Sequence, residues 1–410
     1  MKKVILFCLL ASSSAYPVES DREQFLLEAN KIGKQLREQT KGKSLVEKLP
    51  FMENFAKEFT SNYIAFDIII QELGVQYSFA GLHKKALFTK DRTARVENSS
   101  LEDLTNYKEQ DAIVEILERA KKHQIVMVNE AHDIAQHRVL TYRILSGLWD
   151  QGYRYFAVET LSNSASLQID KGFITNHIGY YTREALYANL ILKAKELGFE
   201  IVSYDQHKPS KLNTIDERET NAGHTIKEKI FDKNPDGKVV IHVGYSHINE
   251  EKWLASKLKD ITKLETLTID QTSRVERSHK KYEHPTYTKA VKDVDLHGPF
   301  IFVNGDKTWS SDSNKWDISV FWPRTRYLNG RPKWVSLNRK TYDLASNDCK
   351  NLYPCMVEVF KFNHTDEVPL DRIIISSKEE PKTVFLSQGS NTIVMSNSNG
   401  KQIKKITVHN

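Results

Sequence analysis

Apolar runs of strand length alternate with amphipathic segments of helix length through the middle of the chain, from about residue 123 to about residue 275. Each run is short and rich in β-branched or aromatic residues, which is typical of a buried strand. The runs are QIVMV at 124–128, YRYFAV at 153–158, FEIVSY at 199–204, KVVIHV at 238–243 and KLETLTI at 263–269. This alternation predicts an α/β fold with a mostly parallel, helix-covered sheet.

The segments between these runs carry helix signals. Apolar residues recur at helical spacing in 135–152, 182–198, 216–231 and 249–261. We expect Thr182 to cap the start of the second segment and Gly198 to end it.

The two ends of the chain have a different texture. Residues 16–120 look helical, with helices expected over 20–39, where Ser20 is a candidate N-cap, and over 101–122. The apolar segment 62–89 between them fits a helix or a strand. From 281 to 410 short strand-like runs alternate with turn residues, such as the SNSNG turn before the last strand. The expected divisions are therefore a leader at 1–15, a helical region at 16–120, an α/β core at 121–280 and a β-rich region at 281–410.

The first fifteen residues read as a secretory signal peptide. Lys2 and Lys3 precede an apolar stretch and the small residues SSA at 13–15. That stretch is too short for a membrane span of roughly 20 residues, and no later segment is long and apolar enough to be one. We expect an exported protein, periplasmic or secreted. In that setting Cys349 and Cys355 would form a local disulfide.

Charge and aromatic content do not indicate a nucleic-acid partner. The net charge of +6 is modest for 410 residues, and basic and acidic residues are interleaved. Four tryptophans in the β-rich region (Trp309, Trp316, Trp322 and Trp334) would pack in a core or line a binding groove.

Polar residues follow four of the predicted strands. Glu130 and His132 come after the first, Glu159 after the second, Asp205 after the third and His247 after the fourth. Because ligands of α/β sheets bind at the carboxyl ends of the strands, we expect these groups to converge. Two of these positions also have a simpler explanation. Glu130 and His132 would be a helix cap and a surface histidine, and Glu159 would form an ion pair with an arginine.

Three further residues belong to the same neighbourhood. Arg218 opens the helix after the third strand, where it would orient carboxylates, stabilise negative charge or form a surface ion pair. Ser246 is a candidate hydrogen-bond donor beside His247. His242 lies within the fourth strand and reads as a core histidine or one that supports the site.

These motifs, in this order, resemble a known superfamily. The superfamily comprises Tiki proteases, TraB/PrgY proteins, erythromycin esterases and ChaN-type haem-uptake proteins. The segments similar to its motifs are NEAH at 129–132, Glu159, RETNAGHTI at 218–226 and GYSH at 244–247. The resemblance implies catalytic roles for Glu130, His132, Glu159, Arg218 and His247. Asp205 is expected to be accessory, because only its position at a strand end supports it. One departure is Asn129, where the first motif of the family has glycine.

The resemblance leads to two functional hypotheses. The first is an exported hydrolase of an ester or amide bond in a small molecule or peptide, with His132, Glu159 and His247 binding zinc or manganese or acting without metal. The alternative is a carrier of haem or another small ligand, with Tyr180 or Tyr181 as a possible axial ligand. The sequence does not indicate an oligomeric state.

Overall fold

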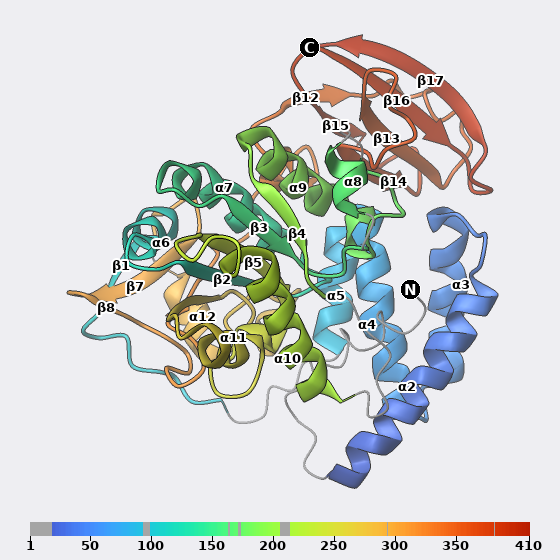
Figure 1. Ribbon diagram of the computed structural model, residues 1–410. Coiled ribbons are helices and arrows are strands. Elements are labelled where there is room, and N and C mark those ends of the chain that lie inside the picture. Colours follow the sequence, from blue (N-terminus) through green and yellow to red (C-terminus); the bar gives the residue numbers. More distant parts are fainter. Residues whose placement is uncertain are drawn as a thin grey trace.

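A computed structural model describes residues 19–92, 99–162, 165–170, 174–205, 214–292, 294–380 and 382–410 (Figure 1). The predicted leader lies outside these residues, so export remains a prediction. Within the described residues no helix is long and apolar enough to cross a membrane.

A six-stranded sheet forms the centre of the molecule, and all its neighbouring strands are parallel. The strand order is β4-β3-β5-β2-β6-β9. The bounds are β2 Ile125–Glu130, β3 Tyr155–Val158, β4 Glu200–Ser203, β5 Val239–Gly244, β6 Thr266–Asp270 and β9 Ile318–Ser319. The first five are the strands that the sequence predicts, and the sixth comes from the C-terminal third of the chain.

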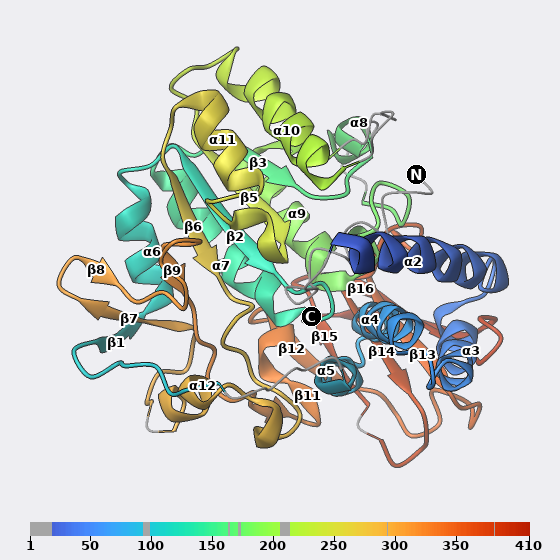
Figure 2. The same cartoon turned by 90° about the horizontal axis from the view of Figure 1, so that it is seen from below.

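Helices cover both faces of this sheet (Figure 2). Val126 and Val128 of β2 belong to the apolar core that includes α6 Ala112–Ala120, α7 Gln136–Asp150 and α9 Ala185–Leu197. Ile125 and Met127 alternate with them and pack with α10 Ile215–Ile226, the π-helix η2 Lys227–Phe231 and α11 Leu254–Thr262. The strand period of two therefore sends successive side chains into separate cores, and a strand buried on both faces is apolar throughout.

Four N-terminal helices stand beside the sheet: α2 Glu19–Gln39, α3 Leu45–Glu58, α4 Tyr63–Phe79 and α5 His83–Arg92. The ambiguous segment 62–89 is therefore helical. Ser20 is not the N-cap of the first helix, which already begins at Glu19.

Two predicted helix starts are wrong. The helix expected over 101–122 is only α6, because Asp111 accepts hydrogen bonds from the backbone N–H groups of Ile113 and Val114 and caps it there. Residues Lys108–Asp111 before it form strand β1. Thr182 does not cap α9 but lies in the short 3-10 helix η1 Tyr181–Arg183, and Glu184 caps α9 instead.

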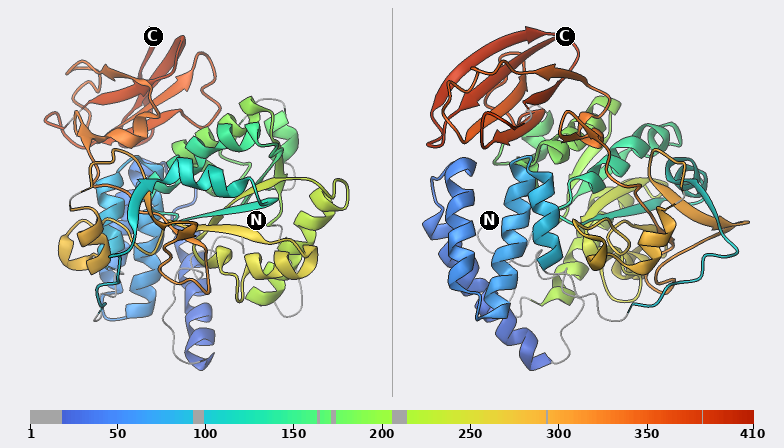
Figure 3. Two further views of the ribbon diagram at one scale, coloured as in Figure 1. Left: turned by 90° about the vertical axis from the view of Figure 1, so that its left-hand side faces the viewer. Right: turned by 180° about the vertical axis from the view of Figure 1, so that it is seen from behind.

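Antiparallel strands form the C-terminal part of the molecule, at one end in Figure 3. Its four-stranded sheet has the order β14-β13-β16-β17, and its core includes Cys349 and Cys355, which form a disulfide. The expected hairpin turn joins the last two strands. The bounds are β12 Lys340–Asp343, β13 Cys355–Lys361, β14 Asp371–Ile375, β15 Thr383–Leu386, β16 Ser390–Ser396 and β17 Gln402–His409.

Short elements complete the described chain. They are α8 Ala165–Asp170, η3 Tyr245–Ile248, η4 Lys280–Tyr282, α12 Pro285–Ala290, β7 Phe300–Asn304, β8 Lys307–Thr308, β10 Tyr327–Leu328, β11 Arg331–Pro332 and η5 Lys333–Ser336. The run RPKWVSLN is thus a strand only at its start. Trp309 and Trp322 are buried, so these two tryptophans are core residues.

Gly198 ends α9 as the sequence predicts, at a φ of 102°. A Cβ atom there would lie 2.8 Å from the Trp149 ring. We expect Gly198→Ala to lower the free energy of unfolding by more than the roughly 1–2 kcal/mol that a left-handed alanine costs, because the ring must also move. Gly152→Ala is the matched control, since Gly152 has a φ of 87° but open space around it. Urea unfolding of the two variants measures the difference, and equal losses would contradict the contact with Trp149.

Candidate active site

Four neighbouring strands bring the predicted polar residues to one edge of the sheet. Strands β4, β3, β5 and β2 are adjacent in that order, and the chain passes from their ends to Asp205, Glu159, the GYSH segment and the NEAH segment. Glu130, His132, Glu159 and His247 are each no more than 2 % exposed. The convergence that the strand-end rule predicts is therefore present, and His132 is not a surface histidine.

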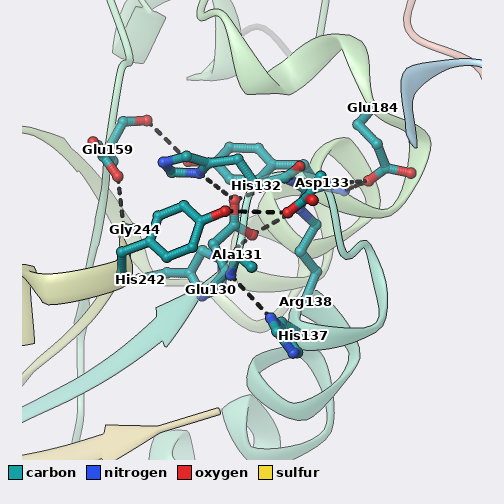
Figure 4. Close-up of polar contacts among 12 residues, drawn as sticks. Glu130, Ala131, His132, Asp133, His137, Arg138, Glu159, Glu184, His242 and Gly244 are labelled. Atoms are coloured by element: carbon teal, nitrogen blue, oxygen red, sulfur yellow. Dashed lines mark hydrogen bonds and ion pairs between the residues drawn. The ribbon is translucent and has the colours of Figure 1, made fainter. Parts of the chain in front are cut away.

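Glu130 is held by a buried arginine that the sequence reading missed. Arg138 on α7 donates from Nε to Glu130 Oε2 at 2.7 Å and from Nη2 to Glu130 Oε1 at 2.9 Å (Figure 4). His242 Nε2 lies 2.9 Å from the same Oε2. Burial would raise the pKa of Glu130, but Arg138 and the two histidines that contact the carboxylate hold this pKa well below its ordinary value. Glu130 is therefore a fixed negative charge.

The fixed carboxylate orients His132. Nδ1 of His132 lies 3.0 Å from Glu130 Oε1, so in the neutral ring the proton stays on Nδ1 and Nε2 carries the lone pair. The ring stacks on Tyr181 at a centroid distance of 4.0 Å and meets the Tyr245 ring edge-on at 5.2 Å. His132 Nε2 is buried and has no hydrogen-bond partner among the described residues.

Glu159 lies next to His132 Nε2. Its Oε2 accepts a hydrogen bond of 2.7 Å from the backbone N–H of Gly244. A Cβ atom built on Gly244 would be 2.4 Å from His132 Nε2 and 3.0 Å from Glu159 Oε2. His132 Nε2 and Glu159 Oε2 therefore both lie next to Gly244. The distance between these two atoms is at most the sum of their distances to the Cβ position.

Arg218 joins Glu159 to Asp205. Its Nη2 donates to Glu159 Oε1 at 3.1 Å and to Asp205 Oδ2 at 2.8 Å, and its Nε donates to Asp205 Oδ1 at 3.0 Å. The ion pair between Glu159 and an arginine, which the sequence analysis gave as the simpler explanation, thus exists. It is buried inside the site. Burial raises the pKa of Asp205, although Arg218 opposes the shift.

His247 faces Glu159 from the other side. Its Nδ1 lies 2.7 Å from Glu219 Oε2, and its Nε2 lies 3.6 Å from Glu159 Oε1. Burial would lower the pKa of His247, but the carboxylates of Glu219 and Glu159 outweigh it and raise the pKa above the ordinary 6.5. His247 Nε2 makes no hydrogen bond within the part of the chain that the structure describes.

The other predicted residues have supporting positions. His242 contacts Glu130 through Nε2 and Thr141 Oγ1 through Nδ1, so it supports the site. Ser246 is half-buried in η3, and its role as a donor remains a prediction. Asn129, the departure from the expected motif, lies in β2 and binds Asp270 through its side chain.

The sequence analysis did not identify three charged residues of the site: Arg138, Glu184 and Glu219. Arg138 also donates to Glu184 Oε2 at 2.9 Å, which ties η1 and α9 to α7. A signal for Arg138 did exist, because a charged residue on the buried face of a helix is costly unless paired. Glu219 follows Arg218 directly, and nothing in its local pattern distinguishes it from its charged neighbours.

The predicted metal site has no preformed counterpart among the described residues. Among the residues that the structure describes, no group of three His, Cys, Asp or Glu side chains is placed to hold a metal ion. The Arg218 guanidinium contacts Glu159, and the two histidines use Nδ1 for carboxylates. Binding of zinc or manganese by His132, Glu159 and His247 therefore stays a prediction, and no preformed cluster supports it.

No family model and no curated protein matches the chain. The solved structures with a detectable likeness include bacterial effectors and toxins. The type III effector HopBA1 is 11% identical with a TM-score of 0.29, over 45% of this chain and 96% of that chain. RRSP, a MARTX toxin effector domain from Vibrio vulnificus, is 16% identical with a TM-score of 0.30, over 54% of this chain and 48% of that chain. A structure titled as bacterial protein toxins is 16% identical with a TM-score of 0.31, over 51% of this chain and 47% of that chain.

These findings correct the expected family. The chain spans about half the length of the RRSP and bacterial-toxin structures, and TM-scores this low carry no argument about its chemistry. The expected membership of the Tiki, TraB/PrgY, erythromycin esterase and ChaN superfamily is wrong, since no family model matches and the similar structures are effector and toxin domains. The ester or amide hydrolase and the haem or small-ligand carrier were expectations of that membership, and both are withdrawn.

Gly244→Ala tests whether His132 and Glu159 meet over Gly244. The added methyl group would overlap the His132 ring, so we expect the ring to be displaced while the fold survives. The measurement is the change in the His132 side-chain NMR signals relative to wild type. Gly305→Ala is the control, because open space surrounds that residue. Unchanged His132 signals in a folded Gly244→Ala protein would contradict the geometry.

Arg138→Met tests the pair that anchors Glu130. It leaves two carboxylates, Glu130 and Glu184, without their buried partner, and we expect the free energy of unfolding to fall by about 3–5 kcal/mol. The control is Arg119→Met, which breaks a partly exposed pair with Glu115 and should cost at most about 1 kcal/mol. Denaturant unfolding compares the two, and similar losses would show that Arg138 is not an anchor.

Proposed function

We propose that this protein is an enzyme that works by general acid–base catalysis, with His132 as the base and His247 as the acid. One observation carries the proposal: two buried imidazoles near Glu159 have Nδ1 bound to a carboxylate, and their Nε2 atoms make no hydrogen bond to any described residue. A carboxylate on one ring nitrogen fixes the tautomer and supports a positive charge when the other nitrogen takes a proton.

The two histidines have different environments, which suits opposite roles. His132 presents a lone pair at Nε2 and would remove a proton from the substrate, while Glu130 stabilises the imidazolium that forms. The raised pKa of His247 favours its protonated ring, so its Nε2 would donate a proton to the leaving or rearranging group. Return of one proton from His132 to His247 through solvent would complete the cycle.

Glu159 would act between them without exchanging protons. Gly244 and Arg218 each donate a hydrogen bond to its carboxylate, which favours the ionised form. A fixed negative charge beside both imidazoles stabilises positive charge on whichever ring is protonated. The burial of all three side chains excludes bulk water and strengthens this interaction.

The charges of the site favour an uncharged polar substrate, either a small molecule or a peptide segment. Both guanidinium groups, Arg138 and Arg218, are already bound by two carboxylates each, which makes them poor receptors for a substrate anion. A reaction that removes one proton and delivers another, as in an elimination, an isomerisation or a group transfer, would use these groups.

The proposal is tested by incubating the purified protein with a small-molecule extract and following compounds that disappear by mass spectrometry. We expect the wild-type protein to deplete at least one compound and His132→Gln and His247→Gln to slow that depletion by about 100-fold or more. His224→Gln is the control, since His224 is an exposed histidine on the same helix as Arg218. Depletion that is absent, or that survives both site substitutions, would contradict the proposal.

The pH dependence of the same depletion tests the role of His247. His247 must be protonated to act as an acid, so the rate should fall as the pH rises through its pKa, which lies above 6.5. Glu219→Gln removes the carboxylate that most raises this pKa and should move the alkaline fall of the rate to lower pH. A fall at the same pH in both proteins would contradict the assignment.

A further inference from the structure

A cavity of about 380 Å³ lies between the N-terminal helices and the segment that contains η1. Its size is within the range of small-molecule pockets. Helices α2, α3 and α4 line it from one side, and Tyr180 and Arg183 line it from the other. It shares no lining residue with the carboxylate and histidine set of the candidate active site.

The lining of this cavity is strongly basic. Five cationic side chains line it: Arg37, Lys41, Lys43, Lys48 and Arg183. Throughout the described ranges, none of the five takes part in a salt bridge of 4.0 Å or less, in contrast to the paired arginines of the candidate active site.

One acidic residue, Glu72, belongs to the same lining. It accepts hydrogen bonds from the Tyr180 hydroxyl and, at 2.8 Å, from Gln76 Nε2. Burial raises the pKa of Glu72, which reduces its ability to neutralise the cations. Burial also lowers the pKa of Lys48, which shows that this ammonium group has lost part of its hydration. An anion in the cavity would compensate that loss.

Part of the wall is apolar. Leu36, Met52 and Ile68 belong to the lining and to the apolar core of the helices. We propose that this cavity binds an amphipathic anion, a phosphate or sulfate ester with an apolar body, whose charged group contacts the lysines and arginines while the body contacts these three side chains. The ester would be a soluble metabolite or the head of a lipid.

The cavity has a short structural connection to the candidate active site. Tyr180 and Arg183 line it, whereas Tyr181 between them stacks on His132 at 4.0 Å. Glu184, the next residue, binds Arg138. A ligand that moved η1 would therefore move the ring that supports His132, although the binding itself does not depend on the proposed function.

The test uses 8-anilinonaphthalene-1-sulfonate, a fluorescent anion with an apolar body, and hexyl phosphate as a competitor. We expect saturable binding of the dye, displacement by hexyl phosphate, no displacement by hexanol, and weaker binding as salt increases. Lys48→Gln should weaken both ligands by about tenfold or more. The matched control is Lys57→Gln on the same helix, because the exposed Lys57 does not line the cavity and should leave binding unchanged.

A double variant tests the same cavity lining in case Lys48→Gln does not fold. Lys41 and Lys43 are exposed, so Lys41→Gln with Lys43→Gln should fold normally and still weaken binding. Sedimentation with phosphatidic acid vesicles distinguishes the two sources of ligand: vesicle binding that hexyl phosphate competes indicates a lipid, and binding of hexyl phosphate alone indicates a soluble ester. The proposal is overturned if neither ligand binds, or if binding is the same in the lining variants and in Lys57→Gln.

Discussion

The buried pair of Glu130 and Arg138 is the interaction on which the candidate site depends. Glu130 ends the central strand β2, and the guanidinium that binds it also binds Glu184, the cap of α9. A buried ion pair is favourable only where its remaining hydrogen-bonding capacity is satisfied. Here His132 and His242 contact the same carboxylate. The pair therefore joins β2, β5, α7 and α9, and the orientation of His132 follows from it.

The parallel sheet accounts for the second half of the site. Strand β3 lies between β4 and β5. Glu159, which follows β3, therefore lies between Asp205, which follows β4, and Gly244 at the end of β5. Its carboxylate receives Gly244 N–H from β5 and Arg218 from α10. Glu219, next along α10, then orients His247. Two similar carboxylate–histidine pairs thus arise from different elements, and both rings lie beside Glu159.

Sequence reasoning predicted the parts of this structure that depend on local pattern and failed where contacts are distant. The first five sheet strands and the strand-end positions of Glu130, Glu159 and Asp205 follow from apolar runs with polar ends. The partner Arg138 could not be assigned from the sequence, because its contact with Glu130 depends on how α7 packs. The family assignment failed for a related reason, since a few motif residues in order do not specify a fold or a reaction.

The central claim is that two carboxylates fix two imidazoles with Nε2 directed at Glu159. Long-range proton–nitrogen NMR of protein labelled with nitrogen-15 histidine measures this directly, with signals assigned by His132→Gln and His247→Gln. The account predicts that the neutral His132 ring carries its proton on Nδ1 and that His247 keeps protons on both nitrogens to a higher pH than in the Glu219→Gln variant. A neutral His132 with the proton on Nε2, or a His247 that loses its second proton at the same pH in both proteins, would contradict it.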